Sequence, residues 1–123
     1  MSYKNFKIWQ DARELVIDIH KMSLTVLSKF EMFEEGNQIR RSSKSVKSNI
    51  VEGYGRRRYK LEYVKFLTYS IASNDETIDH LENLFETKSL KNEKLYDNLH
   101  KRLETLVAVA QLTISSIKAS IVK

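Results

Sequence analysis

Apolar residues recur at intervals of three and four positions along the chain, which is the period of amphipathic helices. The sequence contains no proline, so no helix has to break at one. We therefore predict an all-α protein with a single domain over residues 1–123. The pattern places its four helices near residues 5–28, 33–53, 59–87 and 93–122.

The predicted helix ends depend on a few residues near each break. Gly53 and Gly55 lie two positions apart and allow the chain to leave the second helix through positive φ angles. Asn92 offers a side-chain acceptor at the start of the fourth helix, and Glu93 adds an acidic first turn. The first break is less clear, because residues 29–32 contain neither Gly nor Pro.

The third and fourth predicted helices have the most regular apolar spacing. The third carries Val64, Leu67, Ile71, Asn74, Ile78, Leu81 and Phe85 on one seam. The fourth carries Leu99, Leu103, Leu106, Ala110, Thr113 and Ile117. Such spacing is typical of a left-handed bundle, and short connections make successive long helices antiparallel. We expect an antiparallel up-down-up-down four-helix bundle, in which Asn74 sets the register of its seam.

Two apolar features exceed what one bundle of this size buries. The main apolar face of the first helix is expected to hold Trp9, Ala12, Val16, Ile19 and Val26, and Ile17 and Leu24 lie together well off that face. The fourth helix widens its stripe almost to a full circle with Val107, Leu112, Ile114 and Ile121. Single exposed apolar residues are common on protein surfaces. Two separate features favour a homo-oligomer with these residues at its interface.

The charge of the chain is concentrated in one segment. The formal net charge is +5, from 21 Lys and Arg against 16 Asp and Glu. Residues 40–60 alone carry +7, because they contain eight cations and a single acidic residue, Glu52. The remainder of the chain carries −2. A localised positive field implies an anionic partner, which is a nucleic acid, an acidic protein or a membrane surface.

The composition bears on compartment and on membrane insertion. The chain has no cysteine, which excludes disulfides and thiolate metal sites and fits a cytoplasmic location. Its first ten residues contain two lysines and no apolar run, so we expect no signal peptide. Its least polar stretch, residues 105–117, is well short of the ~20 apolar residues that span a bilayer.

The second predicted helix separates into three arcs at ~100° per residue. Its core arc contains Ile39, Val46 and Ile50, and its outward arc contains Arg40, Lys44 and Lys47. A third arc on the flank of the core contains Gln38, Arg41, Ser45, Asn49 and Glu52. Partly buried polar groups need partners, so we interpret this third arc as a structural polar ladder anchored by Arg41 and Glu52.

The residues of this helix also carry a family resemblance. The pattern runs Trp9…Ala12, Gln38-x-Arg40-Arg41, Ser45, Asn49-Ile50-x-Glu52-Gly53, Arg56, Phe66-Leu67 and Ser73. It resembles the bacterial four-helix-bundle family encoded in intervening sequences of 23S rRNA genes, once labelled ribosomal protein S23. The resemblance covers nearly the whole chain, and the segment from Gln38 to Gly53 is its specific part.

The resemblance implies an up-down bundle that often assembles as a homopentamer. A similar fold serves as the accessory protein of diversity-generating retroelements, which is a basic oligomer implied to bind nucleic acid and the reverse transcriptase. The present chain departs from the family at three positions. Ser42 and Ser43 stand where the family usually has Ala, and Lys47 stands where it often has Pro. Lys47 therefore adds a cation and removes a kink.

No arrangement of residues predicts catalysis. His20, His80 and His100 are dispersed over three predicted helices and are expected at the surface. Bundle di-iron sites need paired Glu-x-x-His motifs, and the chain has only Asp97-x-x-His100 as an approach to one. The Gly53–Gly55 segment lacks the further residues of a phosphate-binding loop. We predict a protein that is not an enzyme and has no catalytic residue, no metal and no cofactor.

An acidic run on the third predicted helix has two interpretations. Asp75, Glu76, Asp79, Glu82 and Glu86 recur at spacings of one to four residues. They form a solvated face of the bundle in the simpler interpretation. In the other, they pair with the basic residues of a neighbouring subunit.

The basic segment is the strongest functional candidate. The predicted nucleic-acid-binding residues are Arg40, Lys44, Lys47, Tyr54, Arg56, Arg57, Arg58, Tyr59 and Lys60. Guanidinium groups bind phosphate in a bidentate manner and tyrosines stack on unpaired bases. No base-reading element is visible, so we expect sequence-tolerant contact with RNA or DNA through phosphates. The alternatives are an adaptor that docks an acidic protein such as a polymerase, and a charged corner that only aids solubility.

Overall fold

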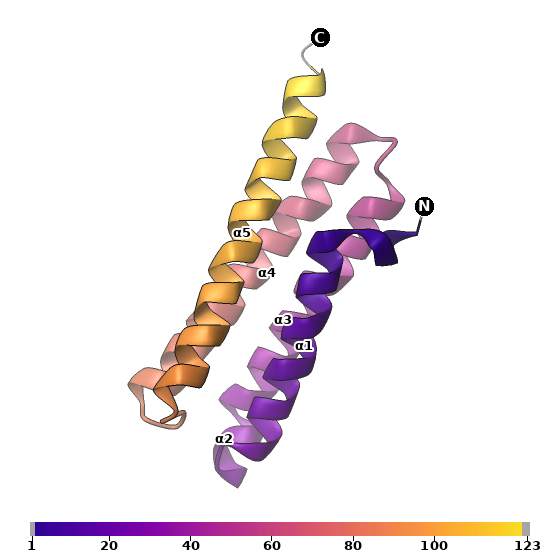
Figure 1. Cartoon of the computed structure of the whole chain (residues 1–123). Coiled ribbons are helices and arrows are strands. Elements are labelled where there is room, and N and C mark those ends of the chain that lie inside the picture. Colours follow the sequence, from indigo (N-terminus) through magenta and orange to yellow (C-terminus); the bar gives the residue numbers. More distant parts are fainter. Residues whose placement is uncertain (1, 122–123) are drawn as a thin grey trace.

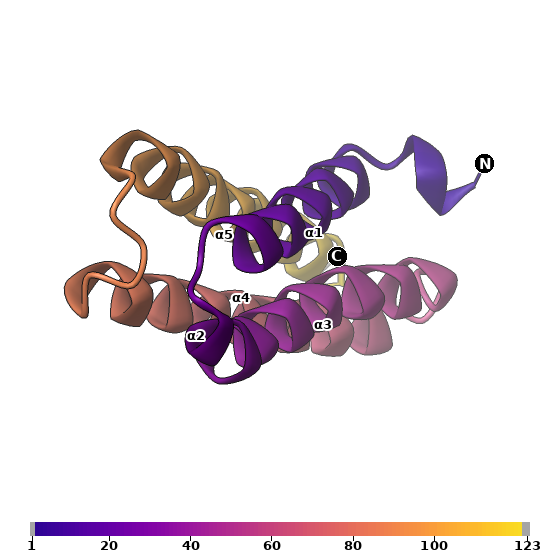
Figure 2. The same cartoon turned by 90° about the horizontal axis from the view of Figure 1, so that it is seen from below.

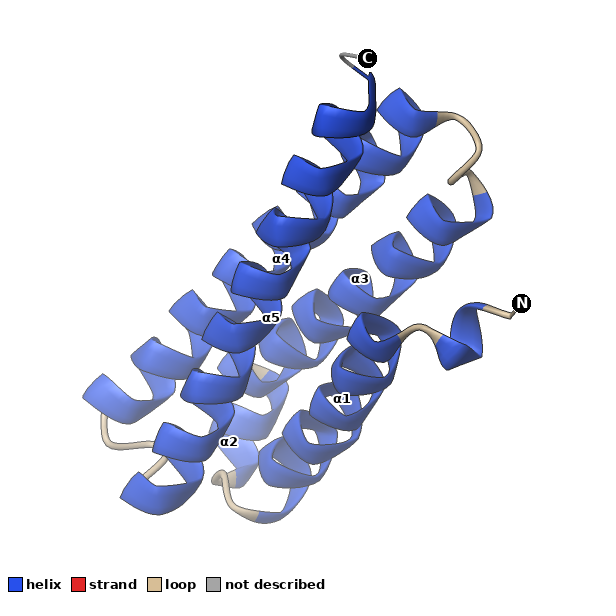
Figure 3. Cartoon of the chain, turned by 45° about the horizontal axis from the view of Figure 1, so that its top comes forward, coloured by secondary structure: helices blue, strands red, loops and turns tan. Residues whose placement is uncertain are grey.

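The computed structural model describes residues 2–121 and is helical throughout (Figure 1). Its elements are η1 (Tyr3–Asn5), α1 (Lys7–Thr25), α2 (Lys29–Phe33), α3 (Glu35–Gly55), α4 (Lys60–Glu86) and α5 (Glu93–Ile121). The four long helices run alternately up and down, and α1 and α5 form one layer over α3 and α4 (Figure 2). Within the described residues there is no strand (Figure 3). The predicted all-helical fold is therefore confirmed.

The unclear break after the first predicted helix is made by the short helix α2. The Ser28 side chain accepts a hydrogen bond from the backbone N–H of Glu31 at 3.3 Å and so caps α2. Gly36 lies just inside α3, and a Cβ atom there would stand 2.9 Å from the Glu31 carbonyl oxygen. A side chain at position 36 would clash with the Glu31 carbonyl, so the close turn from α2 into α3 requires glycine there.

The expectation that Gly53 and Gly55 end a helix through positive φ angles is wrong. Helix α3 continues to Gly55, and no glycine of the described chain has a positive φ. Gly53 is buried instead, and a Cβ atom at this position would lie 3.3 Å from both Tyr63 and Phe66 of α4. Its role is to let the two helices approach closely.

The other two helix ends follow local chemistry. Lys88 has a φ of 64° just after α4, which is the left-handed residue that commonly follows a helix end. The backbone N–H of Leu90 then bonds the Leu84 carbonyl at 2.9 Å. The Asn92 side chain accepts from the Leu95 backbone N–H at 3.1 Å, so its predicted capping role is confirmed.

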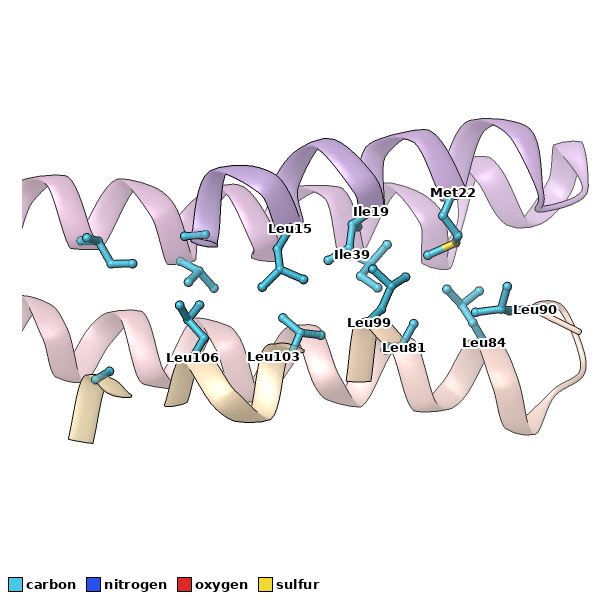
Figure 4. Close-up of a cluster of buried hydrophobic side chains, with 14 of the residues drawn as sticks. Leu15, Ile19, Met22, Ile39, Leu81, Leu84, Leu90, Leu99, Leu103 and Leu106 are labelled. Carbon is cyan, nitrogen blue, oxygen red and sulfur yellow. The ribbon is translucent and has the colours of Figure 1, made fainter. Parts of the chain in front are cut away.

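The apolar core lies along the interior of the bundle (Figure 4). Helix α1 contributes Ile8, Ala12, Leu15, Ile19 and Met22 to it. The predicted face of this helix is therefore partly wrong, because Val16 is only half-buried and Val26 is 43% exposed. Two adjacent stripes of α1 are apolar, and packing against α3 and α5 selects the one that turns inward.

Hydroxyl groups line the contact between α3 and α4. The Thr77 hydroxyl donates to Ser42 Oγ at 2.8 Å, and the Ser70 hydroxyl donates to the Val46 carbonyl at 2.9 Å. Ser42, one of the departures from the resembled family, therefore has a partner on α4. Asn74 is buried as predicted and donates to the Leu103 carbonyl of α5 at 2.9 Å. Among residues 2–121, its Oδ1 atom has no hydrogen-bond partner.

The C-terminal half of α5 extends beyond the end of α1 and packs beside α4 (Figures 1 and 3). Leu112 is 71% exposed there, and Ile17 and Leu24 of α1 are also exposed. Ile121 is exposed as well, whereas Val107 and Ile114 are half-buried. No helix within residues 2–121 is long and apolar enough to cross a membrane. Val122, which the sequence analysis placed at the end of the fourth helix, lies outside the described residues.

Candidate nucleic-acid interface

One flank of α3 faces α1 and its N-terminal approach. Arg40, Lys47 and Tyr54 lie on this flank at intervals of seven residues. Lys47 places its ammonium group 5.9 Å from the centre of the Trp9 ring. The Tyr54 ring lies 5.5 Å from the ring of Phe6. The arc that was predicted to point outward therefore lies in part against the neighbouring helix.

Arg40 is held inside the protein rather than presented to a ligand. Its Nη1 donates to Ser23 Oγ of α1 at 2.8 Å, and its Nη2 donates to the Met32 carbonyl of α2 at 3.0 Å. The predicted outward position of Arg40 is wrong, because its long side chain reaches back and ties α1, α2 and α3 together. Lys44, four residues further along, is exposed.

The predicted polar ladder forms only in its middle. Ser45 bonds Ser73 of α4 through their hydroxyls at 2.8 Å, and the Asn49 side-chain amide donates to the Ser45 carbonyl at 3.0 Å. Gln38, Arg41 and Glu52 are all exposed. The Arg41 side chain makes no hydrogen bond or ion pair with any of residues 2–121. The expected anchoring of the ladder by Arg41 and Glu52 is therefore wrong.

Glu52 pairs instead with Arg56 at the end of α3. Arg56 lies 3.4 Å from a Glu52 carboxylate oxygen and 3.3 Å from one of Glu62 on α4. Its guanidinium also lies 4.9 Å from the centre of the Phe66 ring. Two carboxylates compensate the charge of Arg56, so it adds little to the field at this end of the bundle.

The neighbouring cations of the turn lie on tyrosine rings. Arg57 donates to the Tyr54 carbonyl at 2.8 Å, and its guanidinium carbon lies 4.0 Å from the Tyr54 ring centre. The Arg58 guanidinium lies 5.7 Å from the ring of Tyr59, which is 63% exposed. Lys60, the first residue of α4, is exposed as well. We call Tyr54, Arg57, Arg58, Tyr59 and Lys60 together the arginine corner.

The arginine corner occupies the end of the bundle where α3 turns into α4 (Figure 1). The turn is closed by backbone hydrogen bonds, from the Tyr59 N–H to the Arg56 carbonyl at 2.8 Å and from the Arg57 N–H to the Tyr54 carbonyl at 3.2 Å. Burial raises the pKa of the adjacent Tyr63 hydroxyl, against the opposing charge of Arg57. Of the nine predicted binding residues, the structure gathers Tyr54, Arg57, Arg58, Tyr59 and Lys60 at this turn, and all of them except the half-buried Tyr54 are exposed.

Two of the three histidines differ from the predicted surface placement. His80 is only 8% exposed, and its Nδ1 lies 3.2 Å from a Glu35 carboxylate oxygen. His100 is half-buried and bonds Glu82 at 2.8 Å and Glu104 at 3.2 Å. The bond to Glu82 is the main reason that the pKa of His100 is raised.

His20 is exposed, as was expected of all three histidines. Within residues 2–121, no group of three or more His, Cys, Asp or Glu side chains is placed to hold a metal ion. Of the buried His80 and the half-buried His100, only His100 bonds a carboxylate of the acidic run, Glu82. The Nε2 of His80 lies 3.6 Å from Glu76 and has no hydrogen-bond partner among residues 2–121. Asp75, Asp79 and Glu86 are exposed, which both interpretations of the acidic run require.

Residues 4–111 match the family described as 23S rRNA-intervening sequence protein. The chain belongs to this family. The match confirms the resemblance that the residues around α3 carry, and it includes the whole arginine corner. The match ends within α5, so Leu112, Ile114 and Ile121 lie outside the matched residues.

A solved structure shares the fold of this chain. It is a protein of unknown function from the S23 ribosomal protein family of Bacteroides thetaiotaomicron. The TM-score is 0.79 at 19% sequence identity, over 87% of this chain and 97% of the other. At that identity the likeness shows a common fold alone. No curated protein matches the chain.

Proposed function

We propose that this protein is a non-enzymatic nucleic-acid-binding protein that holds RNA or DNA by its phosphates at the arginine corner. The proposal rests on the exposed cations of the arginine corner and on the carboxylates near them. Arg57, Arg58 and Lys60 are exposed within four consecutive positions. The carboxylates beside them are Glu52, which pairs with Arg56, and Glu62, which pairs with Arg56 and Lys65. Residues 52–65 contain five cations and these two acids, so this end of the bundle keeps a net charge of +3 that is available to an anionic ligand.

The corner also matches phosphate chemically. A guanidinium presents a planar fork of donors that fits two phosphate oxygens. Tyr54 holds Arg57 by its carbonyl and by its ring, so part of the side-chain entropy is lost before a ligand arrives. Arg57 and Arg58 lie in the turn between α3 and α4 rather than along a helix face, which supports sequence-tolerant contact with the phosphate backbone.

The positive surface extends along α3. Lys44 is exposed and Lys47 is half-buried against Trp9. Lys44 stands 13 residues before Arg57 on the same helix and its turn, which corresponds to about 20 Å along the axis. These lysines supply further phosphate contacts to a strand that continues from the corner, whereas Arg40 does not.

The salt dependence of binding tests this proposal. Four phosphate contacts on a single strand imply a slope of about −3 for log affinity against log salt, so a fourfold rise in salt weakens binding about fiftyfold. Changing Arg57 and Arg58 together to Ala is expected to reduce that slope by about 1.4. The measurement is fluorescence anisotropy of a labelled oligonucleotide at several salt concentrations.

A matched control removes two cations from the other end of the bundle. Lys91 and Lys94 are exposed near the start of α5, and their joint change to Ala lowers the net charge by the same amount. This control is expected to leave the slope unchanged. Equal effects of the two double variants, or no binding of any RNA or DNA at low salt, would contradict the proposal.

We further propose that the protein acts as a homo-oligomer, which repeats the arginine corner around a symmetry axis. Ile17, Leu24 and Leu112 are exposed apolar side chains on α1 and α5, and the family resemblance implies a pentamer. Replacing Ile17 and Leu24 with Glu is expected to dissociate the assembly while helical circular dichroism is kept. A wild-type protein that is monomeric by light scattering would refute this part.

One observation favours a protein partner as the second candidate function. Leu61 follows Lys60 and is 73% exposed, and arginines beside apolar anchors are typical of protein interfaces. An adaptor of this kind would dock an acidic protein on the arginine corner. Loss of a copurifying protein in the Leu61→Ser variant, together with absent nucleic-acid binding by the wild type, would favour the adaptor.

A further inference from the structure

We infer that the arginine corner takes an unpaired strand rather than a duplex, with bases stacked on the Tyr59 ring and on the Arg57 guanidinium. This inference rests on the proposed function and specifies its ligand. It also assigns different tasks to the two tyrosines, which the sequence pattern treats alike.

Tyr54 is the half-buried member of the arginine corner and packs against the exposed Arg57. Its ring lies against Phe6 on the N-terminal approach to α1 and against the Arg57 guanidinium, at 5.5 and 4.0 Å between centres. Tyr54 itself is half-buried, whereas Arg57 is exposed. The Phe6 and Tyr54 rings meet in a tilted arrangement with 39° between their planes, and Arg57 is the exposed member of the three. The surface offered to a base at this point is the guanidinium of Arg57, because the ring of Tyr54 is already occupied.

Tyr59 provides a second flat surface beside the first. It is 63% exposed and stands at the N-terminal boundary of α4, where its side chain makes no capping hydrogen bond. Its backbone is fixed by the hydrogen bond from its N–H to the Arg56 carbonyl and by the bond from the Tyr63 N–H to its own carbonyl. The ring has the Arg58 guanidinium 5.7 Å from its centre, but it lies outside the apolar core and most of its surface is open to a base.

The chemistry of these surfaces selects unpaired bases. A base in a duplex has its two faces covered by its neighbours, and a base in a single strand can place one face on an aromatic ring or a guanidinium plane. Such stacking tolerates any base because every base has a π face. Arg57, Arg58 and Lys60 lie within one turn of chain, so phosphates adjacent to a stacked base are within reach of a cation.

The test compares two probes on the same protein, a labelled 12-mer of oligo-dT and the same strand annealed to oligo-dA. Tyr59→Leu removes the ring at an exposed position and is expected to weaken oligo-dT binding about fivefold to a hundredfold. The same variant is expected to change duplex binding by less than about twofold, because phosphate contacts are kept. Tyr59→Phe keeps the ring and is expected to bind both probes as the wild type does.

A second pair of variants separates base stacking on the guanidinium plane from the effect of positive charge. Arg57→Lys keeps the positive charge and loses the guanidinium plane, so it is expected to weaken oligo-dT binding while the salt slope stays the same. Tyr69→Leu serves as the matched control, because Tyr69 is an exposed tyrosine of α4 whose ring packs on Phe66 away from the turn. This control is expected to leave both affinities unchanged.

The outcomes separate the inference from the proposed function. Binding of neither probe at low salt overturns both. Binding of both probes with equal losses in Tyr59→Leu, or with no loss in either, overturns the stacking of unpaired bases and leaves phosphate binding standing. A selective loss of oligo-dT binding in Tyr59→Leu and Arg57→Lys, with Tyr59→Phe unaffected, supports the inference.

Discussion

The change Arg40→Ala tests the division between structural and ligand-binding arginines in α3. Arg40 donates one hydrogen bond to Ser23 Oγ and one to the Met32 carbonyl. The alanine variant removes both donors and leaves the Met32 carbonyl without this partner. Ser23 still has its bond to the His20 carbonyl at 2.9 Å. The contacts among α1, α2 and α3 are weakened at a half-buried position.

The expected loss of stability follows from these two bonds. A hydrogen bond to a charged group contributes roughly 1.5–3 kcal/mol when it is well shielded. Arg40 is half-buried, and water can replace part of each interaction in the variant. We therefore expect the free energy of unfolding to fall by about 2 kcal/mol. Urea unfolding at a fixed protein concentration measures this difference.

Arg41→Ala is the matched control, because Arg41 is the adjacent arginine and is exposed. Its replacement is expected to change the free energy of unfolding by less than about 0.5 kcal/mol. Neither variant is expected to change the salt slope of oligonucleotide binding at the arginine corner. The reasoning is refuted if Arg40→Ala unfolds like the wild type, or if it lowers the salt slope by the ~0.7 of a lost phosphate contact.

Three further expectations concern the bundle itself. Because its bond to Glu82 raises the pKa of His100, His100 stabilises the fold while it is protonated. In urea unfolding, the wild type is therefore expected to be more stable than His100→Gln below pH ~6. This difference in the free energy of unfolding is lost as the pH rises through the pKa of His100 in the folded protein. A difference that stays constant with pH would contradict this expectation. Gly36→Ala is expected to cost about 1–3 kcal/mol in thermal unfolding, because its Cβ would meet a backbone oxygen at 2.9 Å. Gly55→Ala meets nothing within 4 Å and should gain up to about 1 kcal/mol; similar effects of the two would be inconsistent with the packing at Gly36. Asn74→Leu removes a buried oxygen that has no partner among residues 2–121, together with the amide bond to the Leu103 carbonyl. Because Leu103 lies inside α5, its carbonyl keeps a helical N–H donor, and the variant is expected to raise stability by about 1 kcal/mol in urea. A loss above about 2 kcal/mol would argue against an unpartnered oxygen at Asn74.

Local pattern alone determined the four long helices and much of the core. The three-four spacing from Leu99 to Ala110 identified a buried face, and all four of its members, Leu99, Leu103, Leu106 and Ala110, are buried. The same spacing placed Asn74 in the core and left Ile17 and Leu24 outside it. These features depend on the angle of each residue around its own helix axis, which 3.6 residues per turn sets without reference to any neighbour.

Tertiary structure decided which side chains remain available for a ligand. A helical wheel places Arg40 outward, but the positions of α1 and α2 bring acceptors within its reach. Arg56 is compensated partly by Glu62 from the next helix, and His80 is buried where the start of α3 meets α4. The rotation of a helix against its neighbours, and the reach of long side chains across that contact, arise only when the helices pack together.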